Sequence, residues 1–266
     1  MTLVKVGIGL PNTVPARDGT TVLDWARRAE AAGLSTLAVL DRLRYDSVDP
    51  FIALTAAGAV TERIKLATMI AIGPLRPAGV LAKQAQSVHE ISGGRFTLGL
   101  GIGARQDDYE AAGVDPSTRG ATLSSQLAHL RGSEMDILVG GSSGSALARM
   151  ARYADGYAHG GGPPRAFASA ATKARAAWYD HGRSGDPALW GQGYLAVSDP
   201  DRGRDYLSDY YAFTGPFADK IAAGALTSVR AIKDYIRGYA DAGCDELILF
   251  PTTLDVADID RLAEAL

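Results

Sequence analysis

The segment 91–114 holds the densest group of residues that could take part in chemistry. Within it the apolar run 96–100 is typical of a short strand, and Gly99, Gly101 and Gly103 occupy every second position at its end. Because glycine has no Cβ, such a row on one face of a strand lets a flat molecule lie against the backbone. Relief of crowding inside a barrel explains the same row equally well, so both interpretations stay open at this point.

Charged residues follow this strand at once, among them Arg105, Asp107 and Asp108. In parallel α/β proteins, ligands bind at the edge where the strands have their carboxyl ends. A crowded polar loop at such an edge predicts a binding site. The alternative is that these residues form the solvated start of a helix.

A second candidate site is the segment 136–157, in which a short strand leads through Gly140, Gly141, Ser142 and Ser143 into a helix. A helix N-terminus offers free backbone N–H groups and the positive end of the helix dipole, and together with hydroxyl donors these suit a phosphate. No lysine follows the glycines, so the pattern is not a P-loop. A plain N-cap role for one of the serines is the alternative.

Asp41 and Arg42 end the second predicted strand, where a barrel places active-site groups. Successive strand residues point to opposite faces, so these two side chains are not expected to neutralise each other. A structural ion pair or a loop cap is the alternative. His159 is distinct among the histidines because it ends a predicted strand beside three glycines. The other histidines fall on predicted helices, where packing or surface positions are expected: His89, His129 and His181.

Several other chemistries lack their residues. No histidine pair or carboxylate cluster has the spacing of metal ligands, so a metal enzyme is not expected. The run GGSSG at 140–144 does not have the GxSxG spacing of a nucleophile elbow. Lys5 and Lys65 lie within predicted strands and not at their ends, which disfavours a phosphate-sugar lyase or isomerase.

The composition is that of an ordinary globular protein, with 266 residues, 47% hydrophobic content and a formal net charge of −3. This charge gives no basic field for nucleic acid or an anionic membrane. The single cysteine, Cys244, excludes an intrachain disulfide, which fits a reducing cytosol. The first residues resemble a strand more than a signal peptide, and no apolar run approaches the roughly 20 residues that span a bilayer. We therefore expect a soluble cytoplasmic protein.

Strand and helix patterns alternate along the whole chain with short connections, which predicts βα units and a parallel sheet. The predicted strands are 3–10, 36–40, 63–72, 96–100, 136–139, 156–159, 191–197 and 246–250. The predicted helices are 21–32, 50–60, 77–91, 118–131, 145–153, 165–181, 202–223 and 229–242, with one more at the end. Eight such units predict an α/β fold, a single-domain (β/α)₈ TIM barrel over residues 1–266, with a doubly wound sheet as the second choice.

Five segments carry a family resemblance: 31–43, 56–70, 74–114, 137–157 and 239–251. The most specific are SGGRFTLGLGIG followed by DDYEAAG, and the later block that runs from VGGSS to ARYADGY. Together they resemble the bacterial luciferase-like superfamily of flavin- and deazaflavin-dependent oxidoreductases, in its short, mostly actinobacterial type. The resemblance implies a TIM barrel that holds FMN or the deazaflavin coenzyme F-420 at the carboxyl ends of its strands.

The resemblance also implies roles for individual residues. Asp41 matches an acidic position near the reactive face of the deazaflavin, where it is expected to orient a ring edge or move a proton. Arg42, the other expected catalytic residue, would stabilise anionic charge on the ring or substrate. A bulge or a non-proline cis peptide behind the ring is expected around Ala71, Ile72 and Gly73. The remaining cofactor-binding positions are Gly101, Gly103 and Arg105 beside the ring or phosphate, and Gly140, Gly141, Ser142 and Ser143 around the phosphate.

The implied function is that of an oxidoreductase acting on a small organic molecule. It is either a monooxygenase that uses reduced FMN and oxygen, with a separate flavin reductase, or a hydride-transferring F-420 reductase or dehydrogenase. A homodimer is the usual state of the family. The alternative is a non-catalytic barrel that binds a cofactor or ligand and assists a catalytic homologue.

Two departures from the family pattern favour that alternative. Arg42 stands where luciferases and several deazaflavin dehydrogenases have a histidine, and Ala104 stands where the latter often have a glutamate. Both leave the proton-moving residue unassigned. The segment 118–135 is also short, so an open cavity, or one closed by a partner subunit, is expected.

Overall fold

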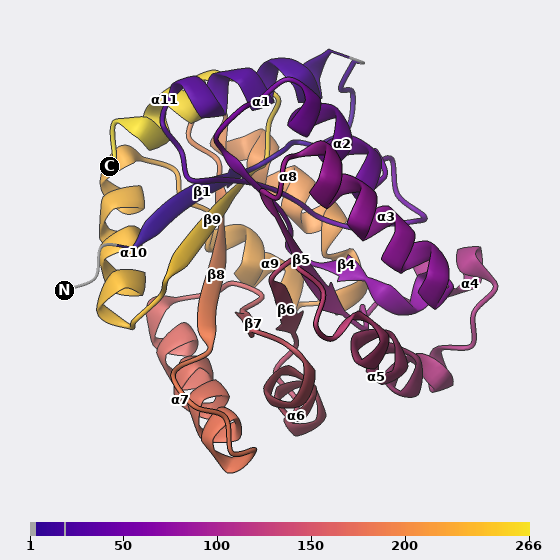
Figure 1. Cartoon of the computed structure of the whole chain (residues 1–266). Helices are drawn as coiled ribbons and strands as arrows, with labels where there is room; N and C mark the ends of the chain where they lie inside the picture. Colours follow the sequence, from indigo (N-terminus) through magenta and orange to yellow (C-terminus); the bar gives the residue numbers. More distant parts are fainter. Residues whose placement is uncertain (1–3, 19) are drawn as a thin grey trace.

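The computed structural model describes residues 4–18 and 20–266, and its parallel strands close into a barrel (Figure 1). The strands are β1 Lys5–Gly9, β2 Thr36–Val39, β3 Lys65–Thr68, β4 Ala71–Ile72, β5 Phe96–Gly101, β6 Ile137–Gly140, β7 Gly156–Ala158, β8 Ala188–Leu195 and β9 Glu246–Pro251. They follow the order β3-β2-β1-β9-β8-β7-β6-β5-β4, and pairing of β3 with β5 closes the ring. Because β3 and β4 follow each other along the same edge of β5, they count as one strand of the barrel, which therefore has eight. The predicted single-domain (β/α)₈ barrel is confirmed.

Alternation along each strand separates two hydrophobic layers. In β9, Leu247 and Leu249 pack outward in the layer between strands and helices, while Ile248 and Phe250 belong to the cluster inside the barrel. All four are at most 1% exposed. This period of two is the pattern that a closed sheet with helices outside requires.

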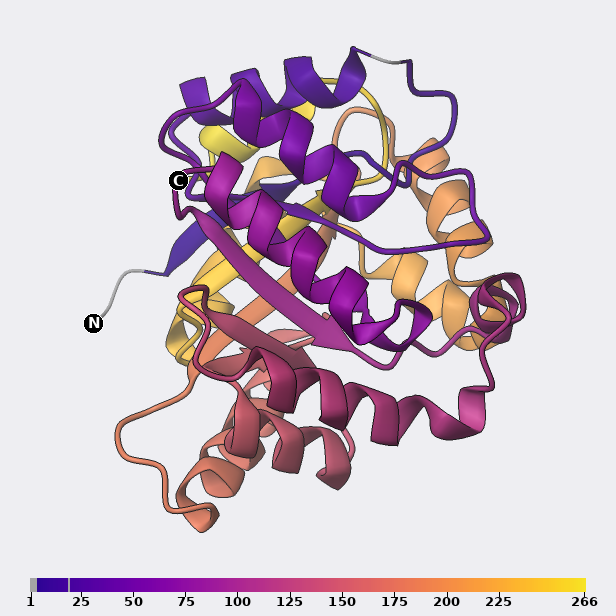
Figure 2. The ribbon, with the colours of Figure 1, turned by 45° about the vertical axis from the view of Figure 1, so that its right-hand side comes forward.

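Helices surround the strands, and in the turned view of Figure 2 the magenta helix α3 lies along the outside of β5. The helices of more than one turn are α1 Thr21–Ala31, α2 Pro50–Ala59, α3 Ala78–Ile91, α4 Gln106–Ala112, α5 Arg119–Leu130, α6 Gly144–Tyr153, α7 Pro164–Asp180, α8 Pro200–Tyr210, α9 Phe217–Ala223, α10 Val229–Asp241 and α11 Ala257–Ala263. Side-chain caps begin several of them; Asp49, for example, accepts hydrogen bonds from the first N–H groups of α2. No described helix is long and apolar enough to cross a membrane.

The third predicted strand, 63–72, is in fact broken into β3 and β4. From Ala67 to Ala71 the chain advances four residues while its partner β5 advances three, from Thr97 to Leu100, so one residue bulges out. The peptide between Met69 and Ile70, inside this bulge, is cis. The expected backbone irregularity is therefore present, but it lies before Ala71 and not around Ala71, Ile72 and Gly73.

Other boundaries also differ from the sequence predictions. The polar stretch after β5 is the short helix α4, not a loop, and the predicted helix 202–223 divides into α8, the turn η3 Ala212–Thr214 and α9. Gly215, with φ of +59°, separates the last two. Strand β8 begins at Ala188, three residues earlier than predicted, and Leu3 of the predicted first strand lies outside the described residues.

Candidate active site

A cavity of about 440 Å³ opens where β2, β4, β5, β6 and β7 have their carboxyl ends. Most residues predicted for the site line it: Asp41, Arg42, Ile72, Gly103, Arg105, Gly140, Gly141 and Ser142. Three predicted residues do not line it: Ala71, Gly101 and Ser143. Its volume falls within the range of pockets for small organic ligands, about 300–1,000 Å³.

Gly99, Gly101 and Gly140 leave room for one side chain, Ile70, which lines the cavity. A Cβ on Gly101 would lie 2.1 Å from Ile70 Cδ1, and one on Gly140 would lie 2.6 Å from the same atom. A Cβ on Gly99 would lie 2.2 Å from the carbonyl oxygen of Thr68. Relief of crowding thus explains Gly99 and Gly101, and the flat surface of the cavity is offered by Met69 and Ile70 instead of bare backbone.

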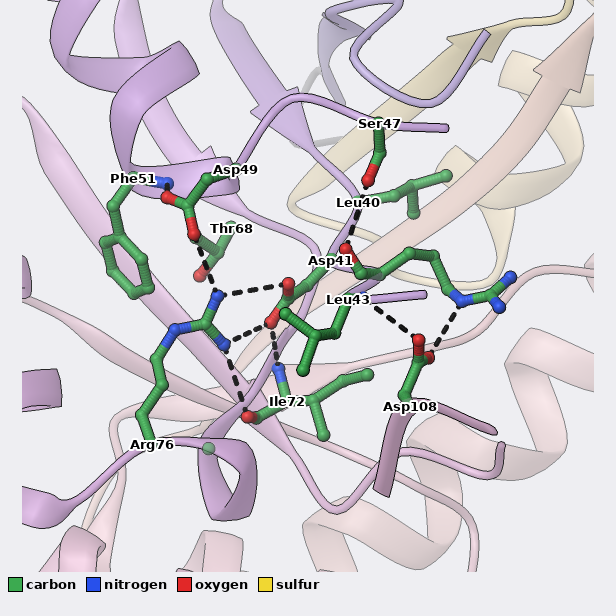
Figure 3. A network of polar contacts seen from close by, with 12 residues as sticks. Leu40, Asp41, Leu43, Ser47, Asp49, Phe51, Thr68, Ile72, Arg76 and Asp108 are labelled. Carbon is green, nitrogen blue, oxygen red and sulfur yellow. Dashed lines mark hydrogen bonds and ion pairs between the residues drawn. The ribbon is translucent and has the colours of Figure 1, made fainter. Parts of the chain in front are cut away.

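Asp41 is buried and binds Arg76, which is not among the residues predicted for the site (Figure 3). Its Oδ2 accepts hydrogen bonds from Arg76 Nη1 at 2.6 Å and from the Ile72 backbone N–H at 2.8 Å. Arg76 also reaches Asp49, the cap of α2, at 3.3 Å. Burial raises the pKa of Asp41 above its ordinary value, and the contacts to Arg76 and Ile72 oppose that rise.

Arg42 points away from Asp41 and joins the strand end to α4. Its Nε donates to Asp108 at 2.8 Å and its Nη2 to Asp107 at 2.9 Å. Asp108 is fully buried and also accepts hydrogen bonds from the backbone N–H groups of Leu43 and Arg44, as Figure 3 shows for Leu43. Among the described residues, no partner is found for the buried Nη1 of Arg42. Asp41 and Arg42 therefore do not neutralise each other, as expected; both line the cavity, and each forms ion pairs with residues outside its lining.

Arg105 is a buried cation held by aromatic rings. Its guanidinium carbon lies 4.5 Å from the ring centre of Tyr210 and 4.1 Å from that of Phe213, and its Nη2 donates to the Tyr210 carbonyl. No carboxylate lies within 4.0 Å of it in the part of the chain that the structure describes. Burial lowers its pKa, and the positive charge of Arg42 adds to this effect. An anion in the cavity would supply the missing opposite charge.

The loop after β6 has the geometry of a helix N-terminus open to solvent. Ser143 is the N-cap of α6, and its Oγ accepts a hydrogen bond from the Ala146 backbone N–H at 3.2 Å. The N-cap alternative thus describes Ser143. Gly141 and Ser142 are exposed and line the cavity, and within the described structure their backbone N–H groups donate to no acceptor. They remain available to an anion.

His159 follows β7 and also lines the cavity. Its Nε2 is buried, and no hydrogen-bond partner for it is found among the described residues. Burial lowers the pKa of the imidazole below 6.5, against the effect of a hydrogen bond to the Gly161 backbone. The ring centre lies 5.6 Å from that of buried Phe167, and a neutral imidazole can accept or deliver a proton.

The lowered pKa of His159 predicts a pH-dependent contribution to stability. Because the folded chain holds this proton less tightly than the unfolded chain, stability is complete above pH about 6.5 and falls as the pH drops toward the folded pKa. We expect His159→Gln to lose less stability than the parent chain between pH 8 and pH 5. Urea unfolding at each pH, with an NMR titration of the imidazole protons, measures this, and parallel pH curves for both chains would contradict it.

The cavity wall also includes residues that the sequence did not single out. Tyr210, Tyr211 and Phe213 come from the end of α8 and from η3, and Gln192 comes from β8. The adjacent tyrosines follow an ordinary amphipathic pattern, so nothing in their spacing distinguishes them from core residues. Within the described ranges no group of His, Cys, Asp or Glu side chains could hold a metal ion.

Comparisons with known proteins agree with this geometry. The family model for luciferase-like monooxygenase matches residues 4–133. An uncharacterized protein from Mycobacterium tuberculosis is 31% identical over 195 residues, which cover 55% of this chain and 67% of that protein. The 5,10-methylenetetrahydromethanopterin reductase of Methanolobus tindarius is 32% identical over 119 residues, 45% of this chain and 36% of that one.

Solved structures share the barrel at low identity. An F420-dependent secondary alcohol dehydrogenase in complex with an F420-acetone adduct has a TM-score of 0.83 and 14% identity over 100% of this chain and 98% of that one. The oxygenating constituent of 3,6-diketocamphane monooxygenase from Pseudomonas putida, in complex with FMN, has a TM-score of 0.74 and 14% identity over 99% and 97% of the chains. These likenesses show the fold, and with the sequence matches they lead to one conclusion: the chain belongs to the luciferase-like family.

Proposed function

We propose that this chain is an oxidoreductase that binds reduced FMN or coenzyme F-420 in the 440 Å³ cavity and acts on a small organic molecule. One observation carries the proposal: an apolar surface, a helix N-terminus with free N–H groups and a buried cation meet in the same cavity. Each part suits a different part of a phosphorylated flavin. The relatives named for F420 and FMN support both cofactors equally.

The residues present fit such a group. Gly141 and Ser142, at the positive end of α6, would hold its phosphate, and Met69 and Ile70 would lie against its ring. When bound, FMN supplies oxygen activation, and F-420 supplies hydride transfer. Arg105, which has no carboxylate partner among the described residues, would stabilise negative charge on the ring or the substrate.

Proton handling falls to residues other than the family's usual ones. Asp41 is engaged with Arg76 and the Ile72 N–H, so in this proposal it orients the ring edge through a fixed carboxylate. Arg42 and Ala104 occupy the positions where the family often has a histidine and a glutamate, so neither position offers a proton-moving group. His159, in contrast, has a ring nitrogen, Nε2, for which no partner is found among the described residues. We assign it the role of holding or moving a proton at Nε2.

Cofactor titration tests the proposal directly. The purified chain is titrated with FMN and with F-420, each oxidised and reduced, and followed by absorbance and calorimetry. We expect one of them to bind at micromolar concentration. FMN binding would favour the monooxygenase with a separate reductase, and F-420 binding would favour the hydride-transferring enzyme. If neither binds, the proposal fails and the non-catalytic barrel takes its place.

Ser142→Asp tests the phosphate position separately. The substitution places a carboxylate in the exposed loop at the N-terminus of α6, where the phosphate is assigned. The carboxylate would repel the phosphate and compete with it for the free N–H groups. We expect affinity for the bound cofactor to fall by about tenfold or more. Ser169→Asp, on the exposed face of α7, adds the same charge elsewhere and should change nothing. Equal affinities for the two variants would show that the phosphate lies elsewhere.

A further inference from the structure

A second cavity, of about 610 Å³, lies beside the first and is the larger of the two. It lies between the loop that leads into α7, strand β8 and the helices α9 and α10. The two cavities share Gly160, Gly161 and Tyr211. These three residues form the boundary between the cavities, and the other residues that line the first cavity do not line the second.

The boundary between the cavities is thin because it is largely backbone. Gly160 and Gly161 have no side chains, and Gly161 has a φ of +95°, a conformation that other residues rarely adopt. A Cβ on Gly160 would meet nothing within 4 Å, so that position opens onto free space. The ring of Tyr211 completes the boundary. A molecule in the second cavity therefore lies close to the contents of the first.

The lining of the second cavity is apolar, and its hydroxyl groups are already paired. Tyr194 and Tyr211 share a hydrogen bond between their hydroxyls. The hydroxyl of Tyr235 donates to the carbonyl of Gly162 at 2.8 Å and also contacts that of Gln192 at 3.0 Å. Pro163, Pro164, Phe217 and Ile221 add further apolar surface to the wall. Such a surface favours a hydrocarbon body over a polar one.

The charged side chains along the lining are all positive. Arg165, in the first turn of α7, and Lys220, on α9, both line the cavity, and no aspartate or glutamate does. Neither cation lies within 4.0 Å of a carboxylate in the described part of the chain. The N-terminus of the long helix α7 adds positive potential at the same place. The rim thus prefers an anion.

We propose that this second cavity is the substrate chamber and takes an apolar organic molecule with a single anionic head group. The head lies between Arg165 and Lys220, and the hydrocarbon body extends along the tyrosines toward Gly160 and Gly161. The role as a substrate chamber rests on the proposed function of the first cavity. The binding preference does not, because it follows from this lining alone.

Calorimetry on the whole chain tests the preference, with octanoate and octanol as probes of equal length. We expect octanoate to bind about tenfold more tightly than octanol, because two cations face its head group. Arg165→Gln with Lys220→Gln should remove this difference and leave octanol binding unchanged. Lys233→Gln, an exposed cation of α10 outside the lining, is the matched control. Ile221→Trp should narrow the cavity and weaken both probes.

Cofactor titrations on the same proteins separate this inference from the proposed function. The variants should bind the cofactor like the parent chain, and octanoate should still bind when the cofactor is saturating. If octanol equals octanoate in the parent chain, or if the double variant binds octanoate normally, the inference is overturned while cofactor binding stands. Displacement of octanoate by the cofactor would overturn the separate chamber. If no cofactor binds but octanoate does, the proposed function fails alone.

Discussion

Asp108→Asn is expected to lower the free energy of unfolding by about 3 kcal/mol, the usual cost of removing one partner from a buried ion pair. Asp108 is fully buried and holds both the guanidinium of Arg42 and the backbone N–H groups of Leu43 and Arg44. The asparagine keeps one acceptor oxygen but carries no charge, so the half-exposed Asp107 would be the remaining carboxylate partner of Arg42. For a chain approaching this size, the loss corresponds to a fall of roughly 6–12 °C in Tm.

The neighbouring carboxylate is the control. Asp107 contacts the same guanidinium at 2.9 Å, but its side chain is 47% exposed, whereas that of Asp108 is fully buried. Exposed ion pairs contribute at most about 1 kcal/mol, so Asp107→Asn should change little. Urea unfolding of the two variants and the parent chain measures both effects. Equal losses for the two substitutions would show that burial does not set the strength of this pair.

Gly101→Ala is expected to cost at least about tenfold in cofactor affinity while the chain stays folded. Its Cβ would lie 2.1 Å from Ile70 Cδ1, the far end of a flexible side chain that can move, and the direction left open to it is the cavity. The side chain of Ile70 would then enter the space assigned to the cofactor ring, which is proposed to lie against Met69 and Ile70. The readouts are a cofactor titration and a thermal unfolding curve for each protein.

The second substitution Ile70→Ala supplies the decisive comparison. In the double variant, the alanine at 101 no longer meets a long side chain, so its cofactor affinity should equal that of Ile70→Ala alone. Gly144→Ala, where a Cβ would meet nothing within 4 Å, should bind the cofactor normally. Normal binding by Gly101→Ala, or a double variant that binds more weakly than Ile70→Ala alone, would show that the alanine at 101 does not act through Ile70.

The barrel was predictable because it rests on local, repeated patterns. Eight strands with outward and inward alternation, each followed by a helix, are visible in the spacing of apolar residues. The break between β3 and β4 was expected from the family resemblance alone and lies earlier than expected. Next to it, the Thr68 side chain bonds both the N–H and the carbonyl of Gly99 on the neighbouring strand, a contact that the spacing of apolar residues does not reveal. A run of apolar residues does not reveal which of them bulges out.

The site was predictable in its positions and less so in its interactions. Asp41, Arg42 and Arg105 were found because strand ends converge at one edge of a barrel. Arg76, the partner of Asp41, lies 35 residues away on a turn before α3, and no short motif joins the two. The glycine row was visible too, but only the packing shows that Ile70, and not a ligand, occupies the space beside Gly101.

The boundary made by Gly160 and Gly161 separates two cavities that draw on different parts of the chain. Every residue that lines the second cavity follows position 159, beyond the segment 4–133 that matches the family model, whereas Asp41, Ile70 and Arg105 lie within that segment. The segment 217–224 contributes to the second cavity alone, so its exchange between homologues would change that cavity and leave the wall of the first one in place.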